Sequence, residues 1–208
     1  MFGNMSILDI GLFFVSILIG MTIHEASHGY MAHLLGDHTA KDEGRLTLNP
    51  LKSIDLLTTI LLPLILVIFG LMPFFVAKPV NINPRNLKFD EFGLALVGLA
   101  GPISNFLLAV IAGIIFRLGV NSLNYVEAQF LVLFAEINIS LFIFNLIPFP
   151  PLDGSRLLYA LAPENIKDIM NKIESLGFIS ILIFMLLIFQ FIATPVFNLE
   201  LHILNFLL

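Results

Sequence analysis

The 208-residue chain contains no cysteine and no tryptophan, and only 12% of its residues are charged. Without cysteine it forms no disulfide and offers no thiolate, so a metal site must use histidine and carboxylate ligands. A soluble domain of this size carries about 25% charged residues, so the low charge excludes an ordinary water-soluble globule. The 10 Lys and Arg residues are outnumbered by 15 Asp and Glu residues. This balance leaves no basic patch that would predict nucleic-acid binding.

Apolar residues, in contrast, make up 58% of the chain. Five apolar stretches each reach the roughly 18 residues needed to cross the hydrocarbon core as a helix. They cover residues 7–35, 56–76, 92–118, 130–147 and 176–193. The sequence therefore predicts an all-α polytopic protein of the cell membrane, folded as a helical bundle.

The polar intervals between these stretches are too short to form a separate soluble domain. We therefore expect one integral-membrane domain over residues 1–208, with a core of about 7–156 and C-terminal helices over 164–208. After Pro195, polar residues interrupt an apolar sequence near helical spacing. This pattern predicts a short amphipathic helix on the outer interface or packed on the bundle.

The positions of the basic residues indicate the orientation of the chain in the membrane. If stretch 56–76 enters the bilayer and returns to the same side, nine of the ten basic residues share one face. Pro63 and Pro73 break this stretch and favour such a re-entrant path. We expect the positive face to be cytoplasmic and the N-terminus to lie outside. A fully spanning 56–76 is the alternative that the sequence leaves open.

The first apolar stretch contains His24-Glu25-Ala26-Ser27-His28, which matches the pattern H-E-x-x-H. On a helix, four residues turn about 400°, so both imidazoles project from one face and can bind one zinc ion. Glu25 lies beside that face, where it can act on water as a general base without being a ligand. A chance match to this pattern, or a structural pairing with another helix, would explain these residues without a metal site. However, a carboxylate at the centre of a membrane helix costs about 2.5–3.5 kcal/mol and persists where something offsets that cost.

A zinc ion that keeps one position for water needs a third protein ligand. Asp153 is the candidate, because three prolines end the fourth apolar stretch before it and Gly154 follows it. An Asp-Gly pair by itself indicates only a turn. Depth favours a ligand, since His24 lies about 25 Å along its helix from residue 7, in the inner third of the hydrocarbon core. Asp153 reaches the same level if the chain crosses the membrane only once between the helix that carries His24 and the helix that precedes Asp153.

Two asparagines within the apolar stretches allow two interpretations. Asn105 and Asn145 can join helices through hydrogen bonds, or they can contact a substrate backbone or the reaction oxyanion. The other histidines are His33, His38 and His202. We expect these three at the surface or at an interface rather than as metal ligands.

The motifs resemble the site-2 protease family of intramembrane zinc metalloproteases, in particular its compact prokaryotic branch without a PDZ or CBS domain. The resemblance covers roughly residues 21–156. It rests on the histidine motif, on two sequences that end the fourth stretch, on a glycine-proline pair before Asn105, and on two sequences between the spans. These are His24 to His28, Asn145-Leu146-Ile147-Pro148, Pro151-Leu152-Asp153-Gly154, Gly101-Pro102, Gly44 to Pro50 and Ala77 to Val80.

The resemblance implies that His24, His28 and Asp153 bind one Zn²⁺ and that Glu25 activates water. It also implies a three-helix catalytic core, with short strands around 45–49 and 76–81 at the mouth of the active site. The expected reaction is hydrolysis of a peptide bond within or near a transmembrane segment of a membrane-protein substrate, as in regulated intramembrane proteolysis. The active site would face the cytoplasmic side.

Two functions from other classes remain as alternatives. A membrane zinc transporter would also place histidine and carboxylate groups within the bilayer, but transporters usually carry structural repeats. The sequence shows no such repeat. A catalytically silent membrane binding protein would not need a general base, and Glu25 is intact. The sequence therefore favours the protease.

Overall fold

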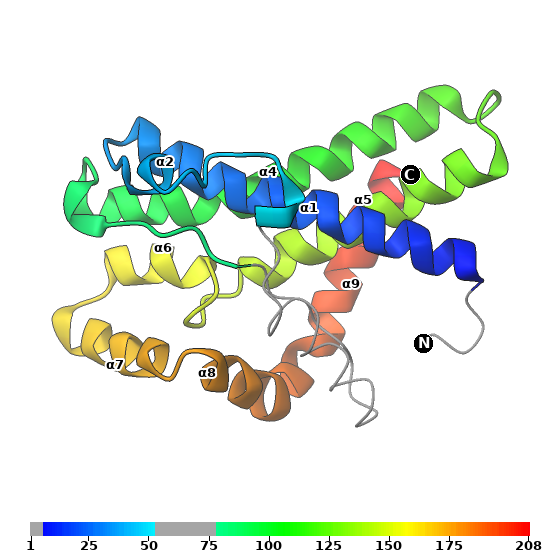
Figure 1. Cartoon of the computed structure of the whole chain (residues 1–208). Coiled ribbons are helices and arrows are strands. Elements are labelled where there is room, and N and C mark those ends of the chain that lie inside the picture. Colours follow the sequence, from blue (N-terminus) through cyan, green and yellow to red (C-terminus); the bar gives the residue numbers. More distant parts are fainter. Residues whose placement is uncertain (1–5, 53–77) are drawn as a thin grey trace.

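A computed structural model describes residues 6–52 and 78–208 of the chain. Its centre consists of helices α1 (Ile7–Leu34), α4 (Asp90–Gly119) and α5 (Tyr125–Asn145), which pack on one another in alternating directions (Figure 1). In the described part of the chain, four helical runs are long and apolar enough to cross a membrane: these three and residues 179–207. The predicted all-α polytopic membrane fold and its three-helix core are therefore confirmed. The predicted stretch 56–76 lies outside the described residues.

Local sequence fixes where two of the central helices begin. Ser6 and Asp9 form a capping box at the start of α1, with the N–H of Asp9 donating to Ser6 Oγ at 3.1 Å. Asn124 and Glu127 form the same arrangement before α5. Such reciprocal bonds satisfy backbone N–H groups that have no partner inside the helix. The caps therefore set the starts of two helices whose lengths carry them across the bilayer.

The central bundle buries polar and small residues among its apolar ones and exposes many large apolar side chains. Along α1, Ser16, Thr22 and the two motif histidines are buried, whereas Ile7 and Phe14 are exposed. The outer faces of α4 likewise expose isoleucine and leucine side chains. Lipid tails solvate apolar side chains as well as a protein core does, so helices in a membrane associate through small and polar residues. This distribution supports the membrane assignment independently of helix length.

The chain between α1 and α4 starts and ends at the same end of the bundle. The backbone N–H of Lys88 donates to the carbonyl of Leu35 at 2.8 Å. Three short helices lie in the described part of this connection: α2 (Thr39–Asp42), η2 (Pro50–Lys52) and η4 (Pro84–Asn86). Because the chain returns, one complete crossing, α4, separates α1 from α5. The condition for bringing Asp153 to the level of the histidines is met.

The short strands expected at the mouth of the site are not formed in the described residues 45–49 and 78–81. The backbone N–H of Thr47 donates to the carbonyl of Arg45 at 2.9 Å, and the N–H of Val80 donates to a side chain. Backbone groups used in this way cannot form a ladder between strands. The prediction of strands was wrong for these residues.

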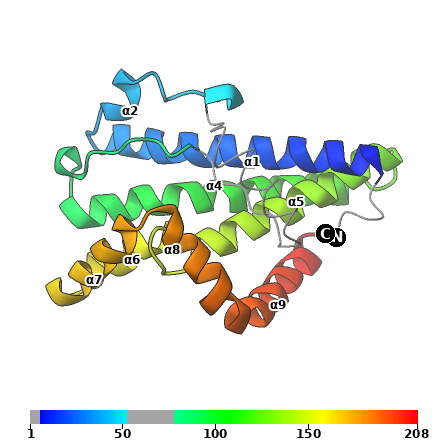
Figure 2. The ribbon, with the colours of Figure 1, turned by 60° about the horizontal axis from the view of Figure 1, so that its bottom comes forward.

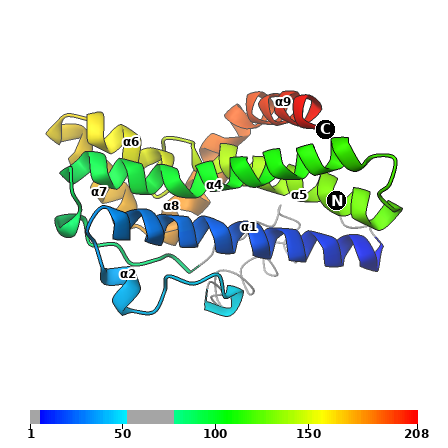
Figure 3. The same ribbon diagram turned by 90° about the horizontal axis from the view of Figure 1, so that it is seen from above.

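The C-terminal part contains α6 (Gly154–Leu161), α7 (Glu164–Ser175), α8 (Phe178–Ile183), the π-helix η5 (Phe184–Ile188) and α9 (Phe189–Leu207). Helices α6 and α7 lie beside the start of α4, and α9 returns toward the opposite end of the bundle (Figures 2 and 3). The expected separate helix after Pro195 is not present, because α9 starts before this proline and continues through it. Leu204 is buried against α4 and α5, which confirms that the tail packs on the bundle.

Candidate metal centre

His24 and His28 occupy successive turns of α1 on its buried face. Their Nε2 atoms lie 3.0 Å apart, and the ring planes cross at 88°. Only 8% of His24 and 6% of His28 is exposed. The helix thus presents two imidazole nitrogens at one point inside the bundle, as the spacing of the motif predicts.

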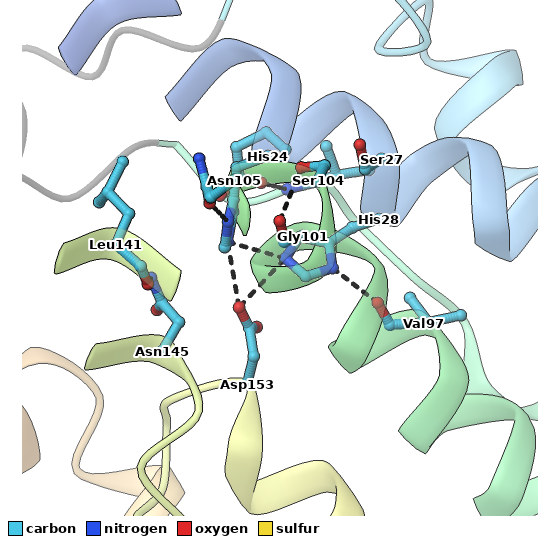
Figure 4. A network of polar contacts seen from close by, with 12 residues as sticks. His24, Ser27, His28, Val97, Gly101, Ser104, Asn105, Leu141, Asn145 and Asp153 are labelled. Carbon is cyan, nitrogen blue, oxygen red and sulfur yellow. Dashed lines mark hydrogen bonds and ion pairs between the residues drawn. The ribbon is translucent and has the colours of Figure 1, made fainter. Parts of the chain in front are cut away.

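Asp153 reaches the same point from the turn between α5 and α6 (Figure 4). Its Oδ2 atom lies 3.0 Å from Nε2 of His24 and 3.3 Å from Nε2 of His28. The three residues form a group whose ligand atoms all lie within 4.8 Å of one another. The structure therefore brings together the three side chains that the sequence predicts as ligands.

Glycines make this close approach possible. A Cβ atom added to Gly101 on α4 would lie 2.4 Å from Nε2 of His28 and 2.7 Å from Cε1 of His24. A Cβ atom at Gly98 would lie 3.0 Å from the carbonyl oxygen of Asp153. The face of α4 that carries both glycines is therefore a cradle into which the imidazoles and the Asp153 turn fit.

The return of the chain to Asp153 also follows from local sequence. Helix α5 ends at Asn145, and Pro148, Pro150 and Pro151 prevent it from continuing. The segment then turns back so tightly that a Cβ atom on Gly154 would lie 2.2 Å from the carbonyl oxygen of Leu146. Glycine after the aspartate is thus required by the close approach of two backbone segments.

Each imidazole is oriented by a partner on α4. Nδ1 of His28 lies 2.7 Å from the carbonyl oxygen of Val97, which can only accept, so this nitrogen carries the proton. Nδ1 of His24 lies 2.6 Å from Oδ1 of Asn105. A proton on each Nδ1 leaves the lone pair of each Nε2 directed toward Asp153. This is the tautomer that metal-binding histidines commonly adopt when the other nitrogen donates to an oxygen.

The arrangement fits a zinc ion. With both Nε2 atoms unprotonated, the site holds two lone pairs and a carboxylate oxygen, and none of them donates a hydrogen bond. Asp153 Oδ2 is accordingly buried without a hydrogen-bond partner in the described part of the chain. Tetrahedral zinc with bonds of about 2.0–2.1 Å separates its ligand atoms by about 3.3 Å, close to the observed separations of 3.0–3.3 Å. A cation at the centre would satisfy all three atoms.

Glu25 lies beside this group and is held by a different contact. One of its carboxylate oxygens, Oε2, accepts a hydrogen bond from the backbone N–H of Val80 at 3.0 Å. The side chain is half-buried. It does not belong to the group of potential ligands, which agrees with a role as a base rather than as a ligand.

Two side chains hold the segment that contains Val80. Arg45 donates from Nη2 to the carbonyl oxygen of Lys78 at 2.9 Å. Asp37 is completely buried and accepts hydrogen bonds from the N–H of Asn83 at 2.7 Å and from Nδ2 of Asn86 at 3.0 Å. These two anchors, one on each side of Val80, keep its N–H directed at Glu25.

The two asparagines singled out in the sequence take different positions. Asn105 is fully buried and joins helices, since Nδ2 donates to Gly20 on α1 at 3.1 Å while Oδ1 faces His24. Nδ2 of Asn145 donates to the carbonyl oxygen of Leu141 at 2.9 Å, within its own helix. Asn145 is only partly buried.

The other histidines do not join the centre. His33, in the last turn of α1, and His38, just before α2, contact each other through their Nδ1 atoms at 2.7 Å. Nδ1 of His202 lies 2.6 Å from the carbonyl oxygen of Asn198 in α9. Neither contact includes Glu25 or Asp153.

Sequence reasoning did not identify the backbone partners of the site or the anchor Asp37. The N–H of Val80 and the carbonyl of Val97 carry no signal, because every residue except proline has both groups. Gly98 and Gly101 do carry one, since small residues on a membrane helix let neighbouring backbones approach closely. A buried aspartate directly after the end of α1 is visible only once the neighbouring segment is placed.

Comparison with known proteins agrees with this centre. Residues 120–189 match the model of peptidase family M50. YwhC of Bacillus subtilis (strain 168), whose name describes a zinc metalloprotease, is 36% identical over 192 residues, which is 88% of this chain and 84% of YwhC. Rip2 of Mycolicibacterium smegmatis, named in the same way, is 30% identical over 159 residues, covering 70% of this chain and 56% of Rip2. No solved structure gives a significant match.

The fold and the site define a metalloprotease embedded in a membrane. The length and identity of the match to YwhC show that the chain belongs to peptidase family M50, the site-2 protease family. Its cofactor is zinc, and His24, His28 and Asp153 form a site that fits this ion.

Proposed function

We propose that the chain cleaves a peptide bond within or next to a transmembrane segment of a membrane-protein substrate, as in regulated intramembrane proteolysis. One observation carries the proposal: His24, His28 and Asp153 meet in the interior of a bundle whose helices have the length and composition of membrane spans. A substrate must reach that depth in the bilayer to be cleaved. We further propose that residues 1–208 act as one domain and that the site opens toward the cytoplasmic side.

In this mechanism, His24, His28 and Asp153 would hold a zinc ion, which would supply Lewis-acid chemistry toward a peptide carbonyl and lower the pKa of a bound water to about 7. Glu25 takes one proton from the attacking water as it adds to the carbonyl carbon. When the carbon–nitrogen bond breaks, Glu25 gives that proton to the leaving amine. The Val80 N–H occupies one carboxylate oxygen of Glu25, so the other oxygen is the one that handles the proton.

Asn105 and Asn145 take separate roles in this proposal. Asn105 orients His24 through the contact between its Oδ1 and Nδ1 of the imidazole. It has no polar atom left for a substrate, because Oδ1 and Nδ2 are both bonded inside the bundle. Asn145 uses Nδ2 to bond its own helix. Its Oδ1 has no hydrogen-bond partner in the described part of the chain, and we propose that it accepts a bond from the backbone of an unwound substrate. Such a bond would help to hold the scissile peptide in an extended form.

The experiment is cleavage of a labelled single-pass transmembrane peptide by the purified protein in detergent. We expect cleavage that a chelator abolishes and that added zinc restores. The same protein in liposomes tests the transporter alternative through zinc flux. Zinc flux without cleavage would contradict the proposal, and zinc binding with neither activity would favour a silent binding protein.

A further inference from the structure

Asn138 is a buried polar residue that belongs to none of the motifs of the metal centre. It lies on α5 and has no exposed surface. Its neighbours are Asn105 on α4 and Gly20 on α1, so it sits where the three central helices meet. A buried amide inside a membrane bundle is costly unless its donors and acceptors are satisfied. This position therefore calls for an explanation.

A continuous series of hydrogen bonds connects Asn138 to the metal centre. Nδ2 of Asn138 donates to the carbonyl oxygen of Phe134 at 2.8 Å. Its Oδ1 accepts a bond from Nδ2 of Asn105 at 2.9 Å. Oδ1 of Asn105 then lies 2.6 Å from Nδ1 of His24. Two amides thus lie between a backbone carbonyl of α5 and a metal-binding imidazole of α1.

The backbone carbonyl of Phe134, at one end of this series, determines the direction of every hydrogen bond in it. The Phe134 carbonyl can only accept, so the Asn138 amide must present its NH₂ group to that carbonyl and its oxygen to Asn105. Asn105 must then turn its NH₂ group toward Asn138 and Gly20, and its oxygen toward His24. An oxygen at that place requires a proton on Nδ1 of His24. The lone pair of Nε2 is therefore the one directed at Asp153.

We propose that Asn138 is a positioning residue of the zinc centre, which holds the Asn105 amide in the orientation that prepares His24 to bind the metal. The inference rests on the proposed function. The chain also leaves room for this residue, because a Cβ atom on Gly20 would lie 3.0 Å from Oδ1 of Asn138. Without the oxygen of Asn138, only the Gly20 carbonyl still holds the NH₂ group of Asn105, and the less restrained amide can turn over and present that NH₂ group to the protonated Nδ1 of His24.

The test uses three variants of the full chain in detergent and measures metal binding without any substrate. Asn138→Leu keeps the side-chain size but removes the oxygen. Asn138→Asp keeps an oxygen facing Asn105 and, when protonated, also keeps a donor for Phe134. Thr22→Val is the matched control, since Thr22 is buried two residues before His24 but, among the described residues, its hydroxyl bonds only to Leu18 in its own helix. Affinity for Zn²⁺ is measured by competition with a chelator, and the ligand field by the absorption spectrum of bound Co²⁺.

We expect Asn138→Leu to bind Zn²⁺ about 10–100-fold more weakly, because a turned Asn105 amide no longer accepts the bond from His24, and loss of such an outer partner of a metal ligand usually costs this much. Its Co²⁺ spectrum should change. Asn138→Asp and Thr22→Val should retain the wild-type affinity and spectrum. If Asn138→Leu does not fold, Asn138→Ser, whose hydroxyl is too short to reach Asn105, takes its place with the same expected loss.

Unchanged affinity and spectrum in the Leu or Ser variant would overturn the positioning role. Equal losses in Asn138→Asp and Asn138→Leu would also overturn it, because packing alone would then explain the effect. His28→Ala separates these results from a failure of the proposed function. If the wild-type chain showed no Co²⁺ binding that depends on His28, the metal centre itself would be refuted together with the inference.

Discussion

The carboxylate of Glu25 accepts a hydrogen bond of 3.0 Å from the backbone N–H of Val80, although 55 positions separate the two residues in sequence. The segment that carries this N–H is fixed by Arg45 on one side and by Asp37 on the other. Neither anchor touches the metal ligands in the described contacts. The proposed general base is therefore oriented by a part of the chain that supplies none of the proposed ligands, so the position of Glu25 and metal binding can be disturbed separately.

Glu25→Gln is expected to retain zinc and to lose cleavage. Glutamine has the same size, and its side-chain oxygen can still accept the bond from Val80, so the site should remain intact. It cannot take a proton from water, and loss of a general acid–base group typically costs about 10²–10⁴-fold in rate. Zinc content by atomic absorption and kcat on a transmembrane peptide check the two parts. Full cleavage by the purified variant would remove Glu25 from the mechanism.

Asp37→Ala should detach the segment that carries Val80. Burial by itself would raise the pKa of the Asp37 carboxyl, but hydrogen bonds from Thr39, Asn83 and Asn86 outweigh it and lower the pKa below its usual 3.8. Hydrogen bonds to a charged group contribute about 1.5–3 kcal/mol each, so we expect a clearly lower melting temperature at neutral pH. Cleavage should also fall, because the Val80 N–H no longer holds Glu25.

The pH dependence of this effect has a defined sign. Because the pKa of Asp37 is lower in the folded state than in the unfolded state, its stabilisation is present above pH 3.8 and is lost as the pH falls through the lower, folded-state value. The difference in melting temperature between wild type and Asp37→Ala should therefore shrink in acid. Asp42→Ala, at an exposed position nearby, is the control and should melt like wild type. A difference that is independent of pH would contradict the role assigned to the carboxylate.

The sequence was sufficient for those features that depend on composition and on short spacing. Apolar runs located α1, α4 and α5 to within a few residues, and the spacing of His24 and His28 predicted their common face. The approach of Asp153 required one further step, the return of the chain between Leu35 and Lys88, which the distribution of basic residues indicated.

Features that depend on neighbours far along the chain could not be predicted in this way. In the described part of the expected strand at 76–81, the side chains of Arg45 and Glu25 take the carbonyl of Lys78 and the N–H of Val80. In the expected strand at 45–49, the N–H of Thr47 instead bonds to the carbonyl of Arg45. Pro195 lies within α9 although proline usually ends a helix. The partners of Asn105 became clear only when three helices had been placed together. Packing, rather than local preference, decided each of these cases.

Gly101→Ala should abolish zinc binding while the bundle still forms. The added methyl group would lie 2.4 Å from Nε2 of His28 and 2.7 Å from Cε1 of His24, which is far inside van der Waals contact, so an imidazole must move away from the metal position. Gly11→Ala is the matched control. Gly11 also lies in a membrane helix, but a Cβ atom there would have nothing within 4 Å. Helical content by circular dichroism and zinc stoichiometry distinguish the two variants. Normal zinc binding by Gly101→Ala would show that the imidazoles do not occupy this cradle.

Asp153→Asn should weaken zinc binding and cleavage together, unlike Glu25→Gln. The amide removes the negative charge that offsets the metal ion, and its NH₂ group would compete for the lone pairs of His24 and His28. We therefore expect a loss larger than the about 10–100-fold associated with outer partners of a metal ligand. The measurement is a zinc titration of protease activity after chelation, in which the variant should need a higher zinc concentration for half-maximal activity. Asp168→Asn, an exposed change of the same type on α7, should titrate like wild type. If Asp153→Asn and wild type reached half-maximal activity at the same zinc concentration, the third ligand would have to be another residue.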